Sequence, residues 1–421
     1  MKIIIRQARI IDPSSPHHLQ PADIWITDGI IRAIRPTIIE EYDLEIAVPE
    51  LCVSPGWVDI FAHFNDPGFE YRETIETGAA AAASGGFTNV FLLPNTSPVV
   101  QNKSAVEYIT QKSKNTISTL HPIGAITKNT DGKELAEMYD MYHSGALCFS
   151  DGLHSVQSSG VLLKALQYVK AIEAVIIQLP DDKSFASNGL MNEGIMATQL
   201  GLAGKPSLGE ELLIARDIEL LRYTNSKLHI TGISSAKSIQ LIRAAKSEGL
   251  KVTCSVTPYH LYYIDEDLNN YDTNLKVNTP LRTADDRAAL QEAVLDGTVD
   301  CIAAHHLPYN SDEKEVEFEK AENGMIGLQT SYAVVKTCLP QITLEQIGQL
   351  FSTNARAIFG LPKISIKENN EAALTLFFEN KEWIFTESHL LSRSKNSPFI
   401  GKSFRGKPYG IINKDKVFLN E

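Results

Sequence analysis

The sequence lacks the features that define several large classes of protein. Its five cysteines stand singly at positions 52, 148, 254, 301 and 338, and no CxxC pair occurs. This spacing argues against a disulfide framework and favours buried, reduced thiols in a cytoplasmic protein. No apolar run reaches the roughly 18 residues that span a bilayer. The N-terminal stretch MKIIIRQARIID interrupts its apolar residues with polar ones, which is typical of a strand and not of a signal peptide.

Positive charge is also scarce. The chain has 39 Lys and Arg against 51 Asp and Glu, which gives a formal net charge of −12. An acidic chain without a basic tract is a poor candidate for binding nucleic acid or an anionic membrane surface. Hydrophobic residues make up 43% of the chain and charged residues 21%, which is ordinary for a globular protein and excludes wholesale disorder.

The two ends of the chain differ in pattern from its middle. Residues 1–54 and 363–421 carry short alternating or apolar runs broken by turn residues, which predicts one small β-sandwich domain built from both termini. Residues 55–362 alternate short β-branched runs with longer helical patterns, as parallel βαβ units do. We therefore expect an α/β barrel domain over 55–362.

Eight predicted strands and eight predicted helices alternate within this region. The strands are expected at 57–61, 89–93, 119–125, 146–149, 174–178, 227–233, 251–256 and 301–304. The helices are expected at 74–84, 103–113, 133–142, 162–172, 208–223, 236–248, 284–295 and 344–359. Eight such pairs predict a (β/α)8 TIM-type barrel, whose functional residues lie at the carboxyl ends of the strands.

The strand ends carry a recognisable set of motifs. They include PGWVDIFAHFNDPG, FEYRETIETGAAAAASGGFTNV, VTPYHLYYIDEDL, YDTNLKVNTPLR and MIGLQT. In order and spacing they resemble the dihydroorotase branch of the amidohydrolase superfamily over nearly the whole chain. The resemblance implies a barrel with a small β-sandwich domain. It also implies a zinc centre that opens or closes a cyclic amide in pyrimidine biosynthesis.

The positions that correspond to the metal ligands of that family are largely substituted. The His-x-His pair of the first strand is Phe61 and His63, and a benzene ring has no lone pair for a metal. Gln178 and Gly232 stand where the fifth and sixth strands of the family end in ligand histidines. His305 stands at the position of the aspartate that serves as ligand and base. No catalytic residue of the family centre is therefore expected to be intact.

The positions that resemble substrate contacts are retained in part. Asn65 replaces the family arginine that grips the substrate carboxylate, so a charge-assisted pair becomes a neutral contact. Asn95 and Asn278 match asparagines that contact the substrate in the family. Asp151 ends the fourth strand in a shortened version of the family motif.

Two hypotheses follow from this pattern. The first is a pseudoenzyme, a dihydroorotase homologue without catalysis or cofactor that acts as a structural or regulatory partner. The resemblance suggests a homodimer and a complex with aspartate transcarbamoylase. The second is an active dihydroorotase or related cyclic amide hydrolase with an unusual mononuclear zinc site formed by His63, Asp151 and His305.

Overall fold

A closed barrel of parallel strands forms the centre of the computed structural model, which describes residues 1–186 and 188–420. Its strands are β6 (Trp57–Ala62), β7 (Phe87–Leu92), β8 (Thr119–Pro122), β9 (Cys148–Phe149), β10 (Val175–Gln178), β13 (Leu228–Ile230), β14 (Val252–Val256) and β15 (Cys301–Ile302). They pair in two arcs, β6-β7-β8 and β9-β10-β13-β14-β15. Parallel bridges between Gly124 and Phe149 and between Ala62 and His306 close the ring. The predicted α/β barrel is confirmed.

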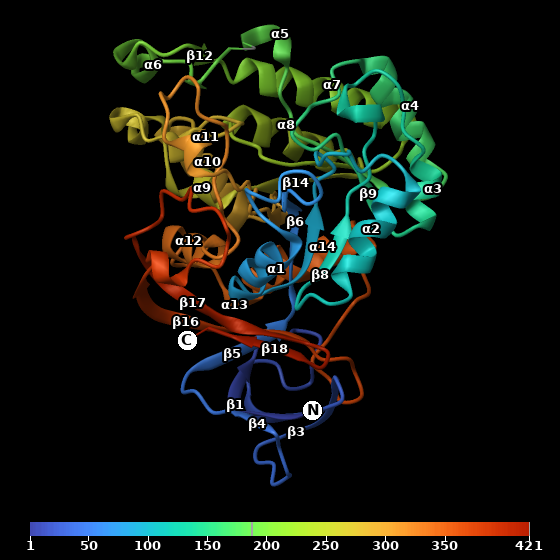
Figure 1. The fold of residues 1–421 in the computed structure, drawn as a ribbon, viewed down its shortest axis with the longest axis vertical. Coiled ribbons are helices and arrows are strands. Elements are labelled where there is room, and N and C mark those ends of the chain that lie inside the picture. Colours follow the sequence, from blue (N-terminus) through green and yellow to red (C-terminus); the bar gives the residue numbers. More distant parts are fainter. Residues whose placement is uncertain (187, 421) are drawn as a thin grey trace.

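Helices surround the barrel, as Figure 1 shows. The longer ones are α1 (Ile75–Ser84), α2 (Lys103–Ser113), α4 (Ser159–Lys170), α7 (Leu208–Thr224), α8 (Ala236–Ser247), α10 (Ala284–Leu295) and α12 (Ser331–Cys338). The shorter ones are α3 (Met138–His143), α5 (Lys183–Ala186), α6 (Ile195–Leu200), α9 (Pro258–Tyr262), α11 (Ser311–Lys314), α13 (Leu344–Gly348) and α14 (Asn354–Ile358). Several begin at a Ser, Thr or Asn whose side chain accepts a free backbone N–H of the first turn, as Thr74 and Ser235 do.

One predicted helix is much shorter than expected. Of the predicted helix at 133–142, only residues 138–142 are helical, as part of α3 (Met138–His143). The residues before it turn back on the chain, because Leu135 pairs with Thr127 and the Lys128 N–H donates to the carbonyl of Glu134. This turn lies beside Asp151 and contributes to the barrel mouth described below.

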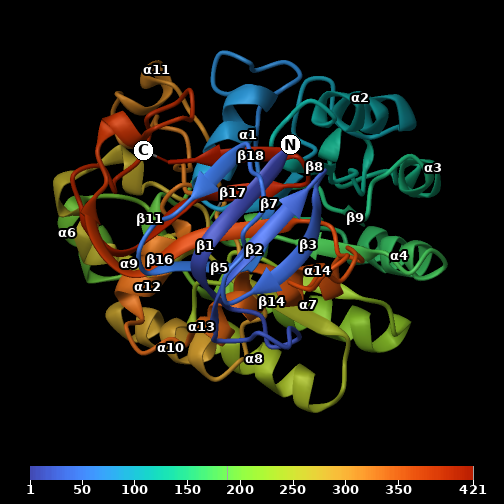
Figure 2. The ribbon, with the colours of Figure 1, turned by 90° about the horizontal axis from the view of Figure 1, so that it is seen from below.

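The terminal segments form one sheet across the amino-terminal end of the barrel (Figure 2). Its strands are β1 (Lys2–Ile10), β2 (Pro21–Thr27), β3 (Ile30–Arg35), β4 (Leu44–Ile46), β5 (Leu51–Pro55), β16 (Ala373–Ile384), β17 (Ser403–Asn413) and β18 (Lys416–Leu419). Strand β5 pairs with β16 in antiparallel orientation, which joins the two ends of the chain in one sheet. A small separate pair, β11 (Met191–Asn192) and β12 (Gly204–Lys205), lies among the loops at the other end.

Aromatic side chains join the sheet to the barrel. The buried ring of Trp57 lies 4.9–5.3 Å from the rings of Tyr332, Phe351 and Phe377. Packing of this kind buries a large apolar area at the base of the barrel and leaves the opposite end, where the strands finish, open to loops. Among the described residues, no helix is both long and apolar enough to cross a membrane.

Candidate functional site at the barrel mouth

A cavity of about 170 Å³ lies at the carboxyl ends of the barrel strands. Its lining consists of His63, Asn65, Phe69, Arg72, Asn95, Leu153, His154, Leu307, Pro308 and Tyr309. Three of the residues predicted from the sequence, His63, Asn65 and Asn95, therefore do come together. Asp151, His305 and Asn278 do not line this cavity.

His63 has both of its ring nitrogens occupied by backbone groups. Nδ1 accepts the N–H of Asn65 at 2.9 Å, and Nε2 lies 3.1 Å from the carbonyl oxygen of Asn95. A carbonyl only accepts, so Nε2 carries the proton and the imidazole is neutral. Burial lowers the pKa of His63 to about 4, in agreement with a neutral ring. No lone pair of His63 remains for a metal unless one of these bonds breaks.

His305 lies deeper, within the barrel. Its ring stacks on Phe61 with the centroids 4.2 Å apart and the planes at 26°. Its Nε2 lies 2.7 Å from Oγ1 of Thr231, and the side chain is 1% exposed. Burial lowers the pKa of His305 to about 3, so the ring is neutral near pH 7. The residue at the family base position is thus packed as part of the core.

The two other substituted ligand positions are also buried. Gln178 ends strand β10 and accepts the N–H of Val156 at 3.4 Å, and its amide nitrogen has no hydrogen-bond partner among the described residues. Gly232 adopts a left-handed conformation with φ of +69°. A Cβ atom placed on Gly232 would lie 2.8 Å from Cε1 of His305 and 2.9 Å from Cδ1 of Leu179, so a side chain at this position requires these two side chains to move.

Asp151 points its carboxylate at the turn that replaces part of the expected helix. It accepts the N–H groups of Ile126 at 3.0 Å and Thr127 at 2.8 Å, and the Thr127 hydroxyl at 2.5 Å. Burial raises the pKa of Asp151 to about 6. The carboxylate therefore holds a loop and offers little free acceptor capacity.

These side chains do not fit a metal centre of the expected kind. Zinc needs about four N, S or O donors converging on one point, with three from the protein in catalytic sites. Within residues 1–186 and 188–420, no group of three or more His, Cys, Asp or Glu side chains is arranged to hold a metal ion. The structure does not bring His63, Asp151 and His305 together as a ligand set.

The predicted substrate contacts are engaged within the protein. The amide of Asn95 donates to the carbonyl of Asp151 at 3.0 Å and accepts the N–H of Leu153 at 3.0 Å. Asn278 accepts from Lys205 Nζ at 2.8 Å and donates to Asp181 at 3.0 Å. Substrate contact by either asparagine stays a prediction, because a ligand would have to compete with these bonds.

Asn65 remains freer. It is 2% exposed and has a left-handed φ of +60°. Its amide nitrogen donates to the carbonyl of Pro308 at 3.4 Å, a long and weak bond. The side chain therefore lies in the cavity wall without a strong protein partner, and substrate contact by Asn65 also stays a prediction.

Two lining residues, Arg72 and Tyr309, were missed at the sequence level. The guanidinium of Arg72 lies over the ring of Tyr309 at 4.9 Å, and its Nε donates to Glu313 at 2.8 Å. Arg72 lies in FEYRETIETG, and Tyr309 directly follows Leu307-Pro308. Apart from these places in the motifs, nothing in the sequence marks the two residues as part of a site. Because Glu313 pairs with Arg72, the cavity wall carries a neutralised cation.

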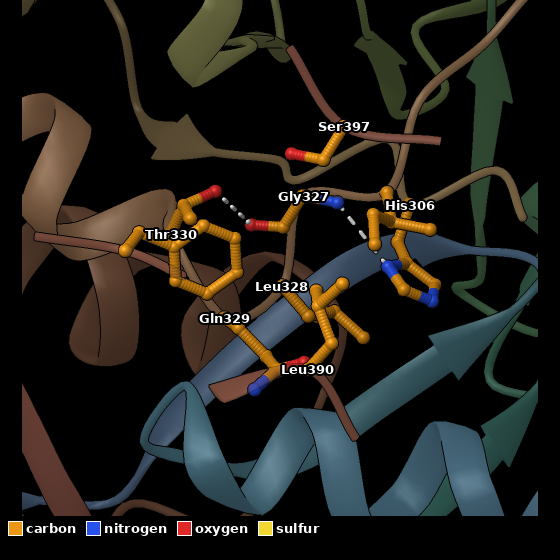
Figure 3. A pocket seen from close by; sticks show the side chains of 9 residues that line it. His306, Gly327, Leu328, Gln329, Thr330, Leu390 and Ser397 are labelled. Atoms are coloured by element: carbon orange, nitrogen blue, oxygen red, sulfur yellow. Dashed lines mark hydrogen bonds between the residues drawn. The ribbon is translucent and has the colours of Figure 1, made fainter. Parts of the chain in front are cut away.

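The histidine after His305 also has a structural role. Nδ1 of His306 accepts the N–H of Gly327 at 3.2 Å, as Figure 3 shows. Its Nε2 faces the buried carboxylate of Glu73 at 3.4 Å. The second cavity beside it has a volume of about 10 Å³, room for about one water molecule. His306 therefore contributes to a packed seam between the barrel and the segment that carries Leu390 and Ser397.

Comparison with known proteins identifies the family. A Dihydro-orotase-like family model matches residues 51–238. A protein from Syntrophus aciditrophicus (strain SB) named "Dihydroorotase" is 38% identical over 427 residues, covering 100% of both chains. One of the same name from Acetivibrio thermocellus is 39% identical over 424 residues, covering 100% of this chain and 99% of that protein. The chain belongs to the dihydroorotase family.

Solved structures of hydantoinases share the fold of this chain. L-hydantoinase from Arthrobacter aurescens is similar with a TM-score of 0.83 and 24% identity, over 99% of this chain and 95% of that one. A D-hydantoinase is similar with a TM-score of 0.85 and 20% identity, over 100% and 96%. At these identities the likeness concerns the fold. The resemblance to the dihydroorotase family is confirmed by the relatives at 38% and 39% identity over the whole chain.

Proposed function

We propose that this chain is a non-catalytic member of the dihydroorotase family. In this proposal it is a cytoplasmic homodimer that serves pyrimidine biosynthesis as a structural or regulatory partner of aspartate transcarbamoylase. The observation that carries the loss of catalysis is the state of the barrel mouth. Phe61, Gln178 and Gly232 offer no imidazole, and the nitrogens of His63 are bonded to the backbone.

The energetic argument supports the same conclusion. Water bound to zinc has a pKa near 7, against about 15.7 for bulk water. Hydrolysis without the metal would have to recover roughly 12 kcal/mol of barrier from other groups. His305 stands at the position of the family base. It is 1% exposed, is stacked on Phe61 and does not line the cavity, so it does not reach a substrate bound there.

The competing candidate is an active cyclic amide hydrolase with an unusual metal site. It is favoured by the name "Dihydroorotase" of relatives that match the full length of the chain. In this case the mouth would have to rearrange, so that His63 releases Asn65 and Asn95 before binding a metal.

One experiment separates the two candidates. The purified protein is incubated with excess zinc, desalted, and assayed for zinc per chain and for turnover of dihydroorotate in both directions, with the Acetivibrio thermocellus relative treated in parallel. We expect the relative to retain zinc and turn over substrate, and this chain to do neither. Turnover that rises in proportion to retained zinc would overturn the proposal.

The partner role needs a separate measurement. Aspartate transcarbamoylase from the same organism is mixed with the chain and examined by analytical ultracentrifugation. A complex with defined stoichiometry supports the role. If the two proteins sediment separately when each is present at tens of micromolar, the result counts against it.

A further inference from the structure

Two of the substituted ligand positions, Gly232 and His305, pack against one another. The ideal Cβ position of Gly232 lies 2.8 Å from Cε1 of His305 and 3.6 Å from its Nδ1. Atoms in folded proteins do not approach a Cβ that closely, so the ring and a side chain at 232 compete for the same volume. The open backbone position at 232 and the imidazole at 305 are therefore complementary.

The ring of His305 is fixed in this position from two sides. Phe61 stacks on one face with a centroid distance of 4.2 Å. Thr231 Oγ1 holds Nε2 at 2.7 Å. An aromatic stack and a buried hydrogen bond each add to the cost of moving the ring, so it cannot swing aside cheaply.

A chain of buried hydrogen bonds extends this contact across the barrel. The hydroxyl of Ser255 donates to Thr231 Oγ1 at 2.8 Å, and Nε2 of His229 lies 3.0 Å from Ser255 Oγ. The other nitrogen of His229 lies 2.9 Å from the hydroxyl of Thr253. Each group is buried or half-buried and has a partner, as a stable internal network requires.

We infer that His305 and Gly232 form an interlocked pair, held by Phe61, Thr231, Ser255 and His229, that closes the barrel interior by packing in place of metal coordination. We call these six residues the mouth clasp. The clasp connects β6, β13, β14 and the segment after β15. The residue types at 232 and 305, two positions that hold metal ligands in the family, are thus coupled. A ligand side chain at 232 requires that His305 is also replaced.

The experiment is a double-mutant cycle with a matched glycine control. Gly232→Ala introduces both a left-handed alanine and the contact with His305. Gly201→Ala is the control, because Gly201 has φ of +68° and nothing within 4 Å of its Cβ position. Melting temperatures are measured for both variants in the wild-type and in the His305→Ala background.

We expect Gly232→Ala to lower the melting temperature by several degrees more than Gly201→Ala when His305 is present. In the His305→Ala background we expect most of this excess to disappear, and the remainder to come from Cδ1 of Leu179, which lies 2.9 Å from the same Cβ position. Equal effects of both in the wild-type background would overturn the inference, as would an excess at Gly232 that is just as large without His305. If Gly232→Ala does not fold alone, recovery of folded protein in Gly232→Ala/His305→Ala supports the pair, and failure of the double variant contradicts it. His305→Val replaces His305→Ala in the cycle if the alanine variant is itself unstable.

The inference deepens the proposed function but can fail separately from it. The cycle measures packing and requires neither zinc nor substrate. Zinc-dependent turnover by the wild-type protein would overturn the proposed function and leave the cycle unaffected. An uncoupled cycle would remove the clasp and leave the loss of ligands at Phe61 and Gln178 unchanged.

Discussion

Nε2 of His63 lies 3.1 Å from the carbonyl oxygen of Asn95, which makes this histidine a donor to the next strand's loop. A histidine that binds a metal must instead direct a lone pair at the ion. Its other nitrogen is equally occupied, because it accepts the Asn65 N–H. The one histidine that remains from the His-x-His pair therefore has a structural function at the barrel mouth.

Removal of metal is the first test of this view. We expect the melting temperature of the protein to change by less than about 1 °C on addition of EDTA or of excess zinc, because only a ligand that binds the folded state stabilises it. Differential scanning calorimetry measures this directly. A rise of several degrees with zinc that EDTA reverses would show that a metal site exists.

The pH dependence of stability provides a second test, centred on His121. Its Nε2 lies 2.9 Å from Oδ1 of Asn89, and burial lowers its pKa to about 4. An unfolded histidine titrates near pH 6.5, so between about pH 6.5 and 4 the unfolded chain binds more protons than the folded one. The stabilising contribution of neutral His121 is therefore full above pH 6.5 and is lost as the pH falls towards 4.

His121→Gln isolates this contribution, because glutamine can still donate to Asn89 but does not titrate. Between pH 7 and pH 4 the free energy of unfolding should fall in both proteins. We expect the fall to be smaller in the variant than in wild type, by on the order of 2 kcal/mol. The carboxyls whose pKa burial raises to about 6, Asp59, Asp151 and Asp217, titrate with the opposite sign in both proteins and cancel in the difference. Urea unfolding at each pH gives the comparison, and parallel curves for the two proteins would contradict the assignment.

Asp151 leads to a third prediction. Asp151→Asn removes the negative charge that strengthens the bonds from the Ile126 and Thr127 N–H groups to Oδ1, and its NH2 group takes the place of Oδ2, where the Thr127 hydroxyl now has no acceptor. We expect a loss of about 1–3 kcal/mol in the free energy of unfolding, measured by urea titration. The same change at the exposed Asp415 should cost less than about 0.5 kcal/mol. Similar losses at the two positions would show that the Asp151 carboxylate does not hold the turn.

The barrel was predictable because its signal is local. Short β-branched runs and capped helices recur along the chain, and the strand at 57–61 was expected within one residue of its observed bounds. The predicted start of the helix at residue 133 was wrong. The helix begins at Met138, because the pairing of Leu135 with Thr127 overrides helical propensity before it. Substituted ligand positions were also readable, since a family motif fixes their spacing.

The engagement of the remaining polar residues could not be predicted, because their partners are distant in sequence. Asn278 is held by Asp181 and Lys205, which lie 97 and 73 residues away. His305 meets Thr231 from 74 residues away. Side chains of suitable chemistry at suitable strand ends therefore resembled a site, while in the fold they satisfy one another's hydrogen bonds.

Restoring the family ligands is the most demanding prediction. A variant with Phe61→His, Gln178→His, Gly232→His and His305→Asp returns each substituted position to the residue type of the family. We expect it to retain zinc after desalting, at about one ion per chain or more, because imidazole and carboxylate donors then replace the clasp at the strand ends. Atomic absorption measures the zinc content.

The matched control keeps His305 and carries only Phe61→His, Gln178→His and Gly232→His. At the positions in question this variant has five histidines, against four histidines and one aspartate in the restored variant, so ligand counting alone predicts that it binds zinc. Steric exclusion predicts the opposite, because the His305 ring lies where a side chain at 232 must project. Zinc retained by the restored variant and absent from the control would identify the 232–305 contact as the barrier to metal binding. Equal zinc in both would show that donor chemistry alone decides.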